Sequence, residues 1–89
     1  MRFEWDRAKA EANRRKHRVS FDEAATIFFD PLSVTIPDPD HSGGERRFIT
    51  MGISSNGRLL VVAHIERGSV LRLISARPVS AVERKRYET

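Results

Sequence analysis

Two arginines near the C-terminus, Arg72 and Arg77, lie in an apolar, strand-like run that ends at Pro78. A charged side chain on a strand is expensive to desolvate, so arginines at such positions are typical of sites that an anion occupies. A guanidinium stays charged and can bind two phosphate oxygens at once. We therefore expect both arginines to bind phosphate, with nucleic acid as its source. For Arg77 a second interpretation stays open, in which it pairs with Glu83 as a structural clamp.

Three further side chains could transfer a proton or contact a phosphate. His64 follows an apolar run, where it is either a general base or a hydrogen-bonded structural histidine. His17 follows Lys16 at the expected end of a helix, so it either binds RNA phosphate or favours the helix dipole. Tyr87 is either an acid, a base-stacking platform or an anchor for its helix. The predicted catalytic set is Arg72, Arg77, His64 and Tyr87, and the predicted RNA-binding set is Lys16, His17, Arg84 and Lys85.

Charge is distributed unevenly along the chain. Residues 1–18 contain seven Lys or Arg and three Asp or Glu, residues 19–45 contain none and six, and residues 46–89 contain nine and three. With a pI near 10.3, the two basic ends would steer the protein toward a polyphosphate. Solvated helix faces would account for any single Lys or Arg, but less well for the whole cluster.

The length and composition indicate one small intracellular domain. A chain of 89 residues supports a single core, so residues 1–89 are expected to form one domain. Cysteine is absent, which excludes disulfides, thiol nucleophiles and thiolate zinc sites. No apolar stretch approaches the roughly 18 residues of a membrane span, and the first residues do not resemble a secretory signal. We expect a cytoplasmic location.

The first half of the chain predicts two helices and an edge strand. Asp6 is a plausible N-cap for a helix to about His17, with an apolar stripe of Trp5, Ala8 and Ala12. Residues 20–23, Ser-Phe-Asp-Glu, form a capping box before a buried helix that ends at Asp30-Pro31. Alternation over residues 32–36 predicts a short edge strand, followed by a loop over residues 37–44.

Two hairpins are predicted in the second half. Asn56-Gly57 separates two apolar runs, and a second turn is expected at Arg67-Gly68. With two-residue loops, the numbers of paired residues would sum to 113 in the first hairpin and to 135 in the second, unless a bulge shifts the register. This register places Arg72 on a working face across from Ala63, and Arg77 at one end of the core face. The core face would hold Arg47, Ile49, Met51, Ile53, Leu60, Val62, His64, Glu66, Leu71 and Leu73, and the working face Phe48, Thr50, Ser54, Leu59, Val61, Ala63, Ile65, Arg72 and Ile74.

A third helix is predicted at the C-terminus. Residues 80–83, Ser-Ala-Val-Glu, form a second capping box and open a helix to about Glu88. It is short and weakly apolar, so it must dock to persist, and its basic residues are available to RNA. The predicted fold class is α+β, with two N-terminal helices, a three- to four-stranded antiparallel sheet built from consecutive hairpins, and one C-terminal helix.

No metal or other cofactor is expected. Asp38, Asp40 and His41 could supply ligands, but Pro37 and Pro39 disturb their spacing and no fourth ligand is near.

Ordered pieces from both ends of the chain resemble the BrnT toxin family of bacterial type II toxin–antitoxin systems. The strongest piece is Ile74-Ser-Ala-Arg77, followed ten residues later by Tyr87. The other pieces are residues 3–6, 13–17, 19–21, 57–62 and 72–77, with Glu83 and Arg84. The resemblance implies a small ribonuclease with a RelE-like fold that inhibits translation by cutting RNA. It also implies a BrnA-like antitoxin with a ribbon-helix-helix domain, which masks the toxin, expected in a 2:2 complex, and alone contacts operator DNA.

Without a metal, such a chain would use the 2′-hydroxyl of RNA as nucleophile, and we predict a metal-independent endoribonuclease. Positioning, together with positive charge on the phosphate, can supply much of the acceleration. A non-catalytic module that binds nucleic acid or protein is the main alternative, because arginines serve both roles. A third interpretation, the antitoxin itself, is weak because a ribbon-helix-helix protein begins with a strand, whereas this chain is expected to begin with helices.

Overall fold

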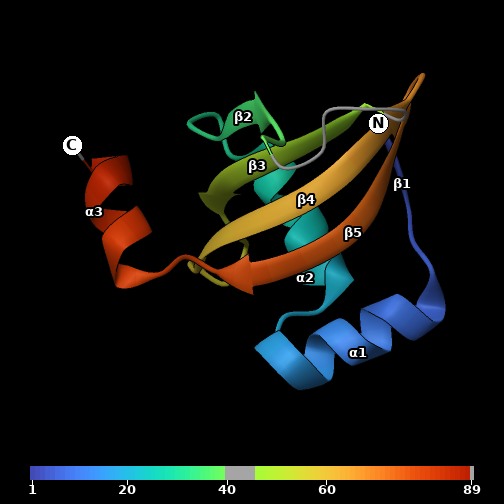
Figure 1. Cartoon of the computed structure of the whole chain (residues 1–89), viewed down its shortest axis with the longest axis horizontal. Helices are drawn as coiled ribbons and strands as arrows, with labels where there is room; N and C mark the ends of the chain where they lie inside the picture. The colour runs from blue at the N-terminus through green and yellow to red at the C-terminus, as the bar shows by residue number, and fades with distance from the viewer. Residues whose placement is uncertain (40–45, 89) are drawn as a thin grey trace.

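The structure is a computed structural model that describes residues 1–39 and 46–88, and the side chains of these residues up to Lys85. It contains five strands, three α-helices and one 3-10 helix (Figure 1). In chain order they are β1 (Arg2–Glu4), α1 (Arg7–His17), α2 (Phe21–Thr26), η1 (Ile27–Phe29), β2 (Val34–Pro37), β3 (Arg47–Ile53), β4 (Leu59–Arg67), β5 (Val70–Pro78) and α3 (Ala81–Glu88). The predicted α+β class is confirmed.

The strands form one sheet in the order β1-β5-β4-β3-β2. All neighbours are antiparallel except β1, which runs parallel to β5 and pairs Glu4 with Arg72. This first strand was not predicted, because three residues are too few to show a period. Figure 1 shows α1 and α2 on one side of the sheet and α3 beyond the end of β5. We call the side that α1 and α2 occupy the covered face, and the other side the open face.

The core lies between the covered face and the two N-terminal helices. Its buried members come from the segment 19–27, from β4 and from β5, namely Val19, Phe21, Ala24, Ile27, Leu60, Val62, Leu73 and Ala76. Trp5 packs against this cluster with its ring 5.8 Å from that of Phe21, as expected for a structural tryptophan. None of the described helices is both long and apolar enough to span a membrane.

Helix α1 is held to the sheet by a buried amide rather than by the predicted alanine stripe. Ala8 and Ala12 are exposed, whereas Asn13 is buried. Its Nδ2 donates to the carbonyls of Val19 at 3.0 Å and Ala76 at 2.9 Å, and its Oδ1 accepts from Ala76 N at 3.0 Å. The prediction that the alanine stripe faces the sheet was wrong, because these hydrogen bonds decide which side of the highly charged helix does so.

The hairpin between β3 and β4 has a longer loop than predicted. Ser54 N donates to Arg58 O and Gly57 N to Ser54 O, both at 2.8 Å, so three residues form the loop. Only Gly57 in this loop takes a left-handed φ, at 79°, as in a turn that ends in a glycine bulge. Paired positions therefore sum to 112, which turns every β3 side chain to the other face. Ile49, Met51 and Ile53 lie on the open face, and Phe48 and Thr50 on the covered face.

Residues from three segments meet in a network beside this loop. Arg58 donates from Nε to Glu23 Oε2 at 3.0 Å and from Nη2 to the Arg18 carbonyl at 2.9 Å, and Ser54 Oγ donates to Glu23 Oε2 at 2.6 Å. The hydrogen bonds from Arg58 are the main cause that lowers the pKa of Glu23. Ser20 Oγ accepts from Glu23 N at 3.0 Å, which is one half of the predicted capping box, whereas the Glu23 carboxylate binds Ser54 and Arg58 and so fastens the loop to α2.

Candidate functional site

Arg72 and Arg77 lie on the same face of the sheet, the open one. In β4 the positions 60, 62 and 64 face the core, so Val61 and Ile65 point the other way. Arg77 pairs with Val61 and Arg72 with Ile65, which puts both arginines on the open face. A bulge makes this possible: Ala63 pairs with Ser75 but His64 with Leu73, so one residue of β5 is extra.

This geometry corrects the predicted faces. The turn between β4 and β5 lies at Gly68-Ser69, so paired positions near it sum to 137 rather than 135. A shift of two preserves the faces, and Arg72 lies where it was expected, although it is across from Ile65 instead of Ala63. Arg77 was assigned to the core face, and this was wrong because the bulge adds one residue before it.

The guanidinium of Arg72 meets a carboxylate from the neighbouring strand. Its Nη1 donates to Glu4 Oε2 at 3.1 Å, and the two side chains are 30% and 44% exposed. Pairs this open to water contribute little to stability. A phosphate could therefore replace Glu4 at a small cost, and β1 supplies a partner for Arg72 that the sequence did not indicate.

Arg77 is held by Glu83, as the clamp interpretation expected. Its Nη1 and Nη2 donate to the two carboxylate oxygens of Glu83 at 2.8 and 2.9 Å. Glu83 also accepts from Ser80 N at 3.0 Å, and Ser80 Oγ accepts from Glu83 N at 3.2 Å, which completes the predicted capping box. The hydrogen bonds from Arg77, then that from Ser80, lower the pKa of Glu83 to about 2, and the same contact raises the pKa of Arg77.

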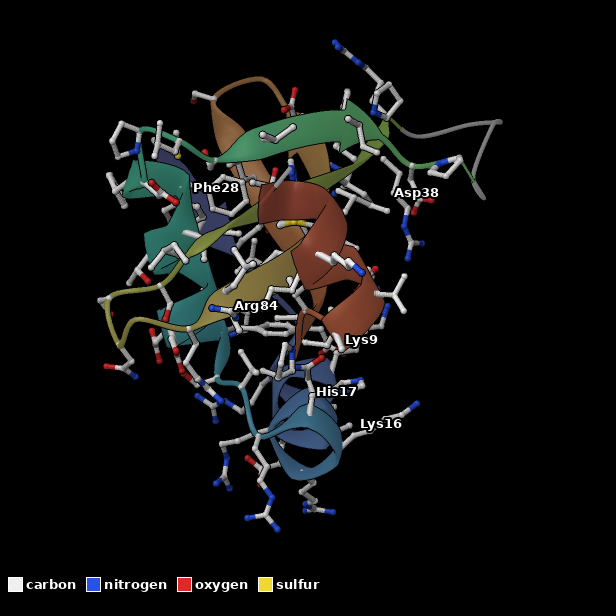
Figure 2. The ribbon with its side chains drawn as sticks, turned by 90° about the vertical axis from the view of Figure 1, so that its left-hand side faces the viewer. Lys9, Lys16, His17, Phe28, Asp38 and Arg84 are labelled. Atoms are coloured by element: carbon white, nitrogen blue, oxygen red, sulfur yellow. The ribbon has the colours of Figure 1, made fainter. Side chains whose placement is uncertain are left out.

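The predicted RNA-binding residues gather at one end of the molecule. Lys16 and His17 end α1, and Arg84 and Lys85 lie in α3, which follows Arg77. Figure 2 is viewed from this end and shows Lys16, His17 and Arg84 on the near side. Lys16, Arg84 and Lys85 are exposed and His17 is half-buried. We call these four residues, together with Arg77, the basic end.

His64 is separated from both arginines by the sheet. It points to the covered face and is 1% exposed, with Nε2 at 2.8 Å from Thr50 Oγ1. The ring of Phe28 meets it edge-on at 4.9 Å, and that of Phe48 stacks at 6.0 Å. Burial lowers the pKa of His64, against a weaker effect of Glu66 that raises it. Its imidazole is hydrogen-bonded on the covered face and lies away from the phosphate that the arginines would bind.

Some predicted residues lie partly or wholly outside the described part of the chain. Tyr87 belongs to α3, but its side chain is outside the described residues. Asp40 and His41 are also outside them. Asp38 is buried with its carboxylate 3.3 Å from Arg47 Nε, which gives this aspartate a structural partner.

The family is decided by a comparison that covers most of the chain. A family model described as the ribonuclease toxin BrnT of type II toxin-antitoxin systems matches residues 5–83. The chain belongs to the BrnT ribonuclease toxin family. The crystal structure of the Brucella abortus ribonuclease toxin BrnT, determined at 1.1 Å resolution, has a similar fold, with a TM-score of 0.70 and 23% identity over 90% of this chain and 97% of that one. At this identity the likeness concerns the fold alone. No curated protein matches the chain significantly.

Membership in the BrnT family also answers the antitoxin interpretation. The argument against it assumed a helical start, and this was wrong, because the chain begins with β1 and two helices follow. What excludes the interpretation is the family match, together with the pairing of β1 to β5 of its own chain. As a member of a toxin family of type II systems, the chain has RNA as its substrate and an antitoxin as its partner.

Proposed function

We propose that this BrnT-family toxin is a metal-independent endoribonuclease that cleaves RNA by attack of the 2′-hydroxyl and so inhibits translation. The observation that carries the proposal is the bulge in β5, which gives Arg72 and Arg77 a common face. Each guanidinium there binds a carboxylate. A phosphate offers the same kind of oxygen pair, and its negative charge grows in the pentacoordinate transition state.

The two arginines would contact the RNA phosphate in different ways. Arg72, whose partner Glu4 is open to water, binds the scissile phosphate when the RNA displaces that carboxylate. Arg77 exchanges Glu83 for phosphate, or contacts phosphate through the edge of the guanidinium that Glu83 leaves free. Lys16, His17, Arg84 and Lys85 bind the RNA backbone beyond it.

Proton transfer is assigned by position. Tyr87 follows Glu83 by four residues in α3, a spacing that favours the same side of a helix and places this position toward Arg77. We propose it as the acid for the leaving 5′-oxygen of a scissile phosphate that lies between Arg77 and Arg72 on the open face. His64 faces the covered side and does not act as the base in this proposal, so the proton of the attacking 2′-hydroxyl passes to solvent water. Tyr87→Phe should lower cleavage and leave RNA binding unchanged, whereas equal cleavage by the variant would remove Tyr87 from the mechanism.

The decisive experiment measures cleavage and stability together. RNA is incubated with the full chain in excess chelator, and product ends are examined for cyclic phosphate. Arg72→Lys keeps the charge but loses the fork, so turnover should fall about 100-fold while the melting temperature barely changes. Arg15→Lys, an exposed position of α1, is the matched control.

Three results would contradict this mechanism. Loss of all cleavage in chelator, with recovery on adding magnesium, would exclude metal independence. A parallel fall of activity and melting temperature in Arg72→Lys would make the arginine structural. RNA binding with no cleavage would favour the non-catalytic module.

We further propose that a ribbon-helix-helix, BrnA-like antitoxin masks the basic end in a 2:2 complex, and that operator DNA is contacted through the antitoxin only. Charge complementarity favours an acidic or amphipathic segment against Lys16, Arg84 and Lys85. Among the described residues, α3 makes few contacts with other elements, so a partner can contact or shift it. Co-expression with mass determination tests the stoichiometry. A chain ending at Pro78 that still forms a tight complex with the antitoxin would show that the antitoxin does not need α3 for binding.

A further inference from the structure

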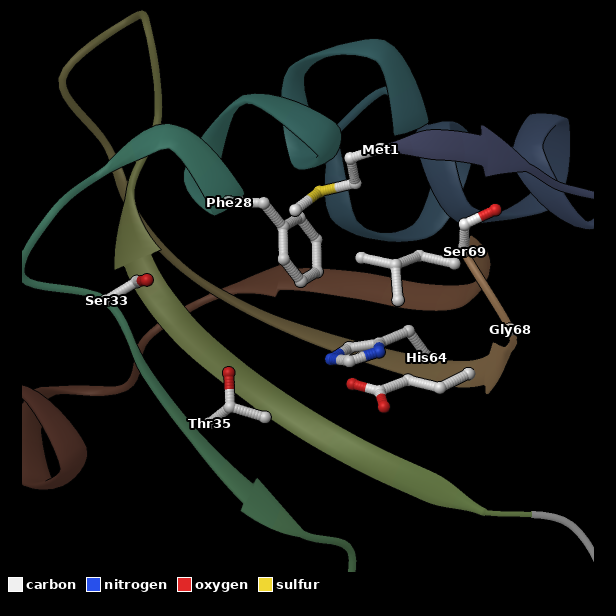
Figure 3. Close-up of a pocket in the computed structure, with 9 residues that line it drawn as sticks. Met1, Phe28, Ser33, Thr35, His64, Gly68 and Ser69 are labelled. Carbon is white, nitrogen blue, oxygen red and sulfur yellow. The ribbon is translucent and has the colours of Figure 1, made fainter.

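A pocket of about 470 Å³ lies on the covered face, away from the two arginines. It is bounded by η1, by β2 and by the turn between β4 and β5 (Figure 3). Its lining residues are Met1, Phe28, Ser33, Thr35, His64, Glu66, Gly68, Ser69 and Leu71. The pocket is large enough for a flat heterocycle and combines apolar walls with hydroxyl, imidazole and carboxylate groups.

Among the described residues, one nitrogen of the His64 imidazole has no hydrogen-bond partner. Nε2 is 2.8 Å from Thr50 Oγ1, which in turn is 2.7 Å from Thr35 Oγ1, so a chain of hydrogen bonds fixes the ring. Nδ1 is buried and makes no hydrogen bond within the part of the chain that the structure describes. Buried polar atoms are nearly always paired in proteins. Because His64 lines the pocket, a ligand in it could supply the missing partner.

Glu66 adds a negative charge to the same wall. It lies two residues after His64 in β4, close enough to act on its titration. Glu66 has no ion pair among the described residues, unlike Glu4, Glu23 and Glu83. A carboxylate in this position accepts two neighbouring N–H donors. Phe28 and Leu71 provide apolar contact for the flat faces of a ligand that carries two such donors.

We propose that this pocket binds a base of the RNA substrate and prefers guanine. Guanine presents two adjacent N–H donors on its Watson–Crick edge, which match the two oxygens of Glu66, and its carbonyl oxygen lies beside them. With both donors bound to Glu66, guanine offers its carbonyl oxygen to His64 Nδ1 when that nitrogen carries the proton and Nε2 accepts from Thr50 Oγ1. Adenine has a single amino group on that edge, next to an acceptor that Glu66 would repel. Single-stranded RNA is read in this way, through splayed bases on aromatic side chains.

The inference rests on the proposed function and adds base recognition to it. Leu71 lines the pocket, whereas Arg72 is on the opposite face of the same strand. The base in the pocket thus belongs to a nucleotide some distance along the RNA from the phosphate at Arg72. A lysine side chain of a protein partner would also satisfy Glu66, but it offers no acceptor to His64, so we favour the base.

The test is titration of the full chain with GMP, AMP, CMP and UMP, followed through the His64 ring resonances and by calorimetry. GMP should bind at least about tenfold more tightly than the other three, as expected for one well-matched edge. Glu66→Gln should weaken GMP binding at least about tenfold and leave the fold intact. Glu11→Gln, which removes the same charge from an exposed site on α1, should bind GMP as the unmodified chain does.

A second variant guards against loss of folding. Ser69→Trp is an exposed turn position at the pocket, and the new side chain should fill the pocket and abolish the His64 response to GMP. Equal affinity for all four nucleotides would overturn the guanine preference. Lack of any nucleotide response, unchanged binding in both variants, or binding of N-acetyl-lysine methylamide in place of GMP would overturn the site.

Cleavage assays separate this inference from the proposed function. A chain that cleaves RNA through Arg72 but binds no nucleotide here would overturn the pocket assignment alone. A chain that binds GMP here but cleaves no RNA would support the pocket and overturn the nuclease mechanism.

Discussion

The polar contacts between the helices and the sheet differ from those on the open face. Asn13 and the pair Glu23–Arg58 each join separate elements through several hydrogen bonds. Arg72 and Arg77 each meet one carboxylate in a partly exposed pair. The contacts of Asn13 and Glu23–Arg58 hold the fold together. The ion pairs of Arg72 and Arg77 position guanidinium groups that can exchange a carboxylate for a phosphate. Similar ion pairs therefore have different roles, and the burial of the carboxylate and the number of linked elements distinguish them.

The largest expected loss of stability is for Glu23→Ala. The change leaves Arg58 and Ser54 without their shared acceptor, which is buried although Arg58 is 38% exposed. Loss of these charge-assisted hydrogen bonds should cost about 3 kcal/mol of unfolding free energy. Urea denaturation measures it, with Asp22→Ala as the exposed neighbour for control. A loss below about 1 kcal/mol would place this pair with those of the open face.

Asn13→Ala should have the next largest effect. It removes three hydrogen bonds between α1, the following segment and β5, and leaves buried backbone groups of Ala76 unpaired. We expect a loss of about 2 kcal/mol. Chemical denaturation would show it, and Arg15→Ala in the same helix should be nearly neutral. An unchanged midpoint would mean that packing alone positions α1.

Glu83→Gln should change stability by less than about 1 kcal/mol, because the pair it breaks is partly exposed. Freed from its carboxylate, Arg77 should bind RNA about two- to fivefold more tightly, as measured with a non-cleavable oligonucleotide. Slower cleavage with unchanged affinity would instead mean that Glu83 positions Arg77 for the reaction.

Acid should reveal the Arg77–Glu83 contact with little effect on the fold. The pKa of Glu83 is lowered to about 2 from 4.5, so its contribution to stability is complete above 4.5 and is lost as the pH falls toward 2. The carboxyl carbon resonance of Glu83 should titrate near pH 2. In Arg77→Lys it should titrate closer to 4.5, and a midpoint that does not move would mean that Ser80 alone lowers the pKa.

The sequence predicts the elements better than their registration. Asp6, Ser20 and Ser80 mark helix starts with local signals, and all three helices begin where these residues indicate. The faces of β4 were assigned correctly from the expected hairpins, although its first five residues are all apolar and do not alternate. By contrast, Asn56-Gly57 predicts a two-residue turn, and the network around Glu23 that accompanies the three-residue loop links residues 30 or more positions apart. Local propensity contains no information about such contacts.

The contacts of the candidate site also divide into those that the sequence predicts and those that it does not. The pair Arg77–Glu83 was foreseen as one of two interpretations, because both residues lie within six positions of each other. The partner of Arg72 was not, because Glu4 is 68 residues away and reaches it through a strand too short to recognise. The pocket beside His64 was also missed, since it is assembled from Phe28, Thr35 and Glu66, which come from three segments.

Because of the bulge in β5, the sequence separation of the two arginines does not by itself decide whether their side chains share a face of the sheet. Five positions separate Arg72 from Arg77, an odd number that in a regular strand would send them to opposite sides. The extra residue restores an even count on the pleat. A relative whose arginines are four positions apart, with three residues between them and no bulge, would present the same pair on one side. A relative that lacks one residue at this place in an alignment can therefore keep both arginines on one face. A relative with the same spacing as this chain but a regular strand would have them on opposite faces.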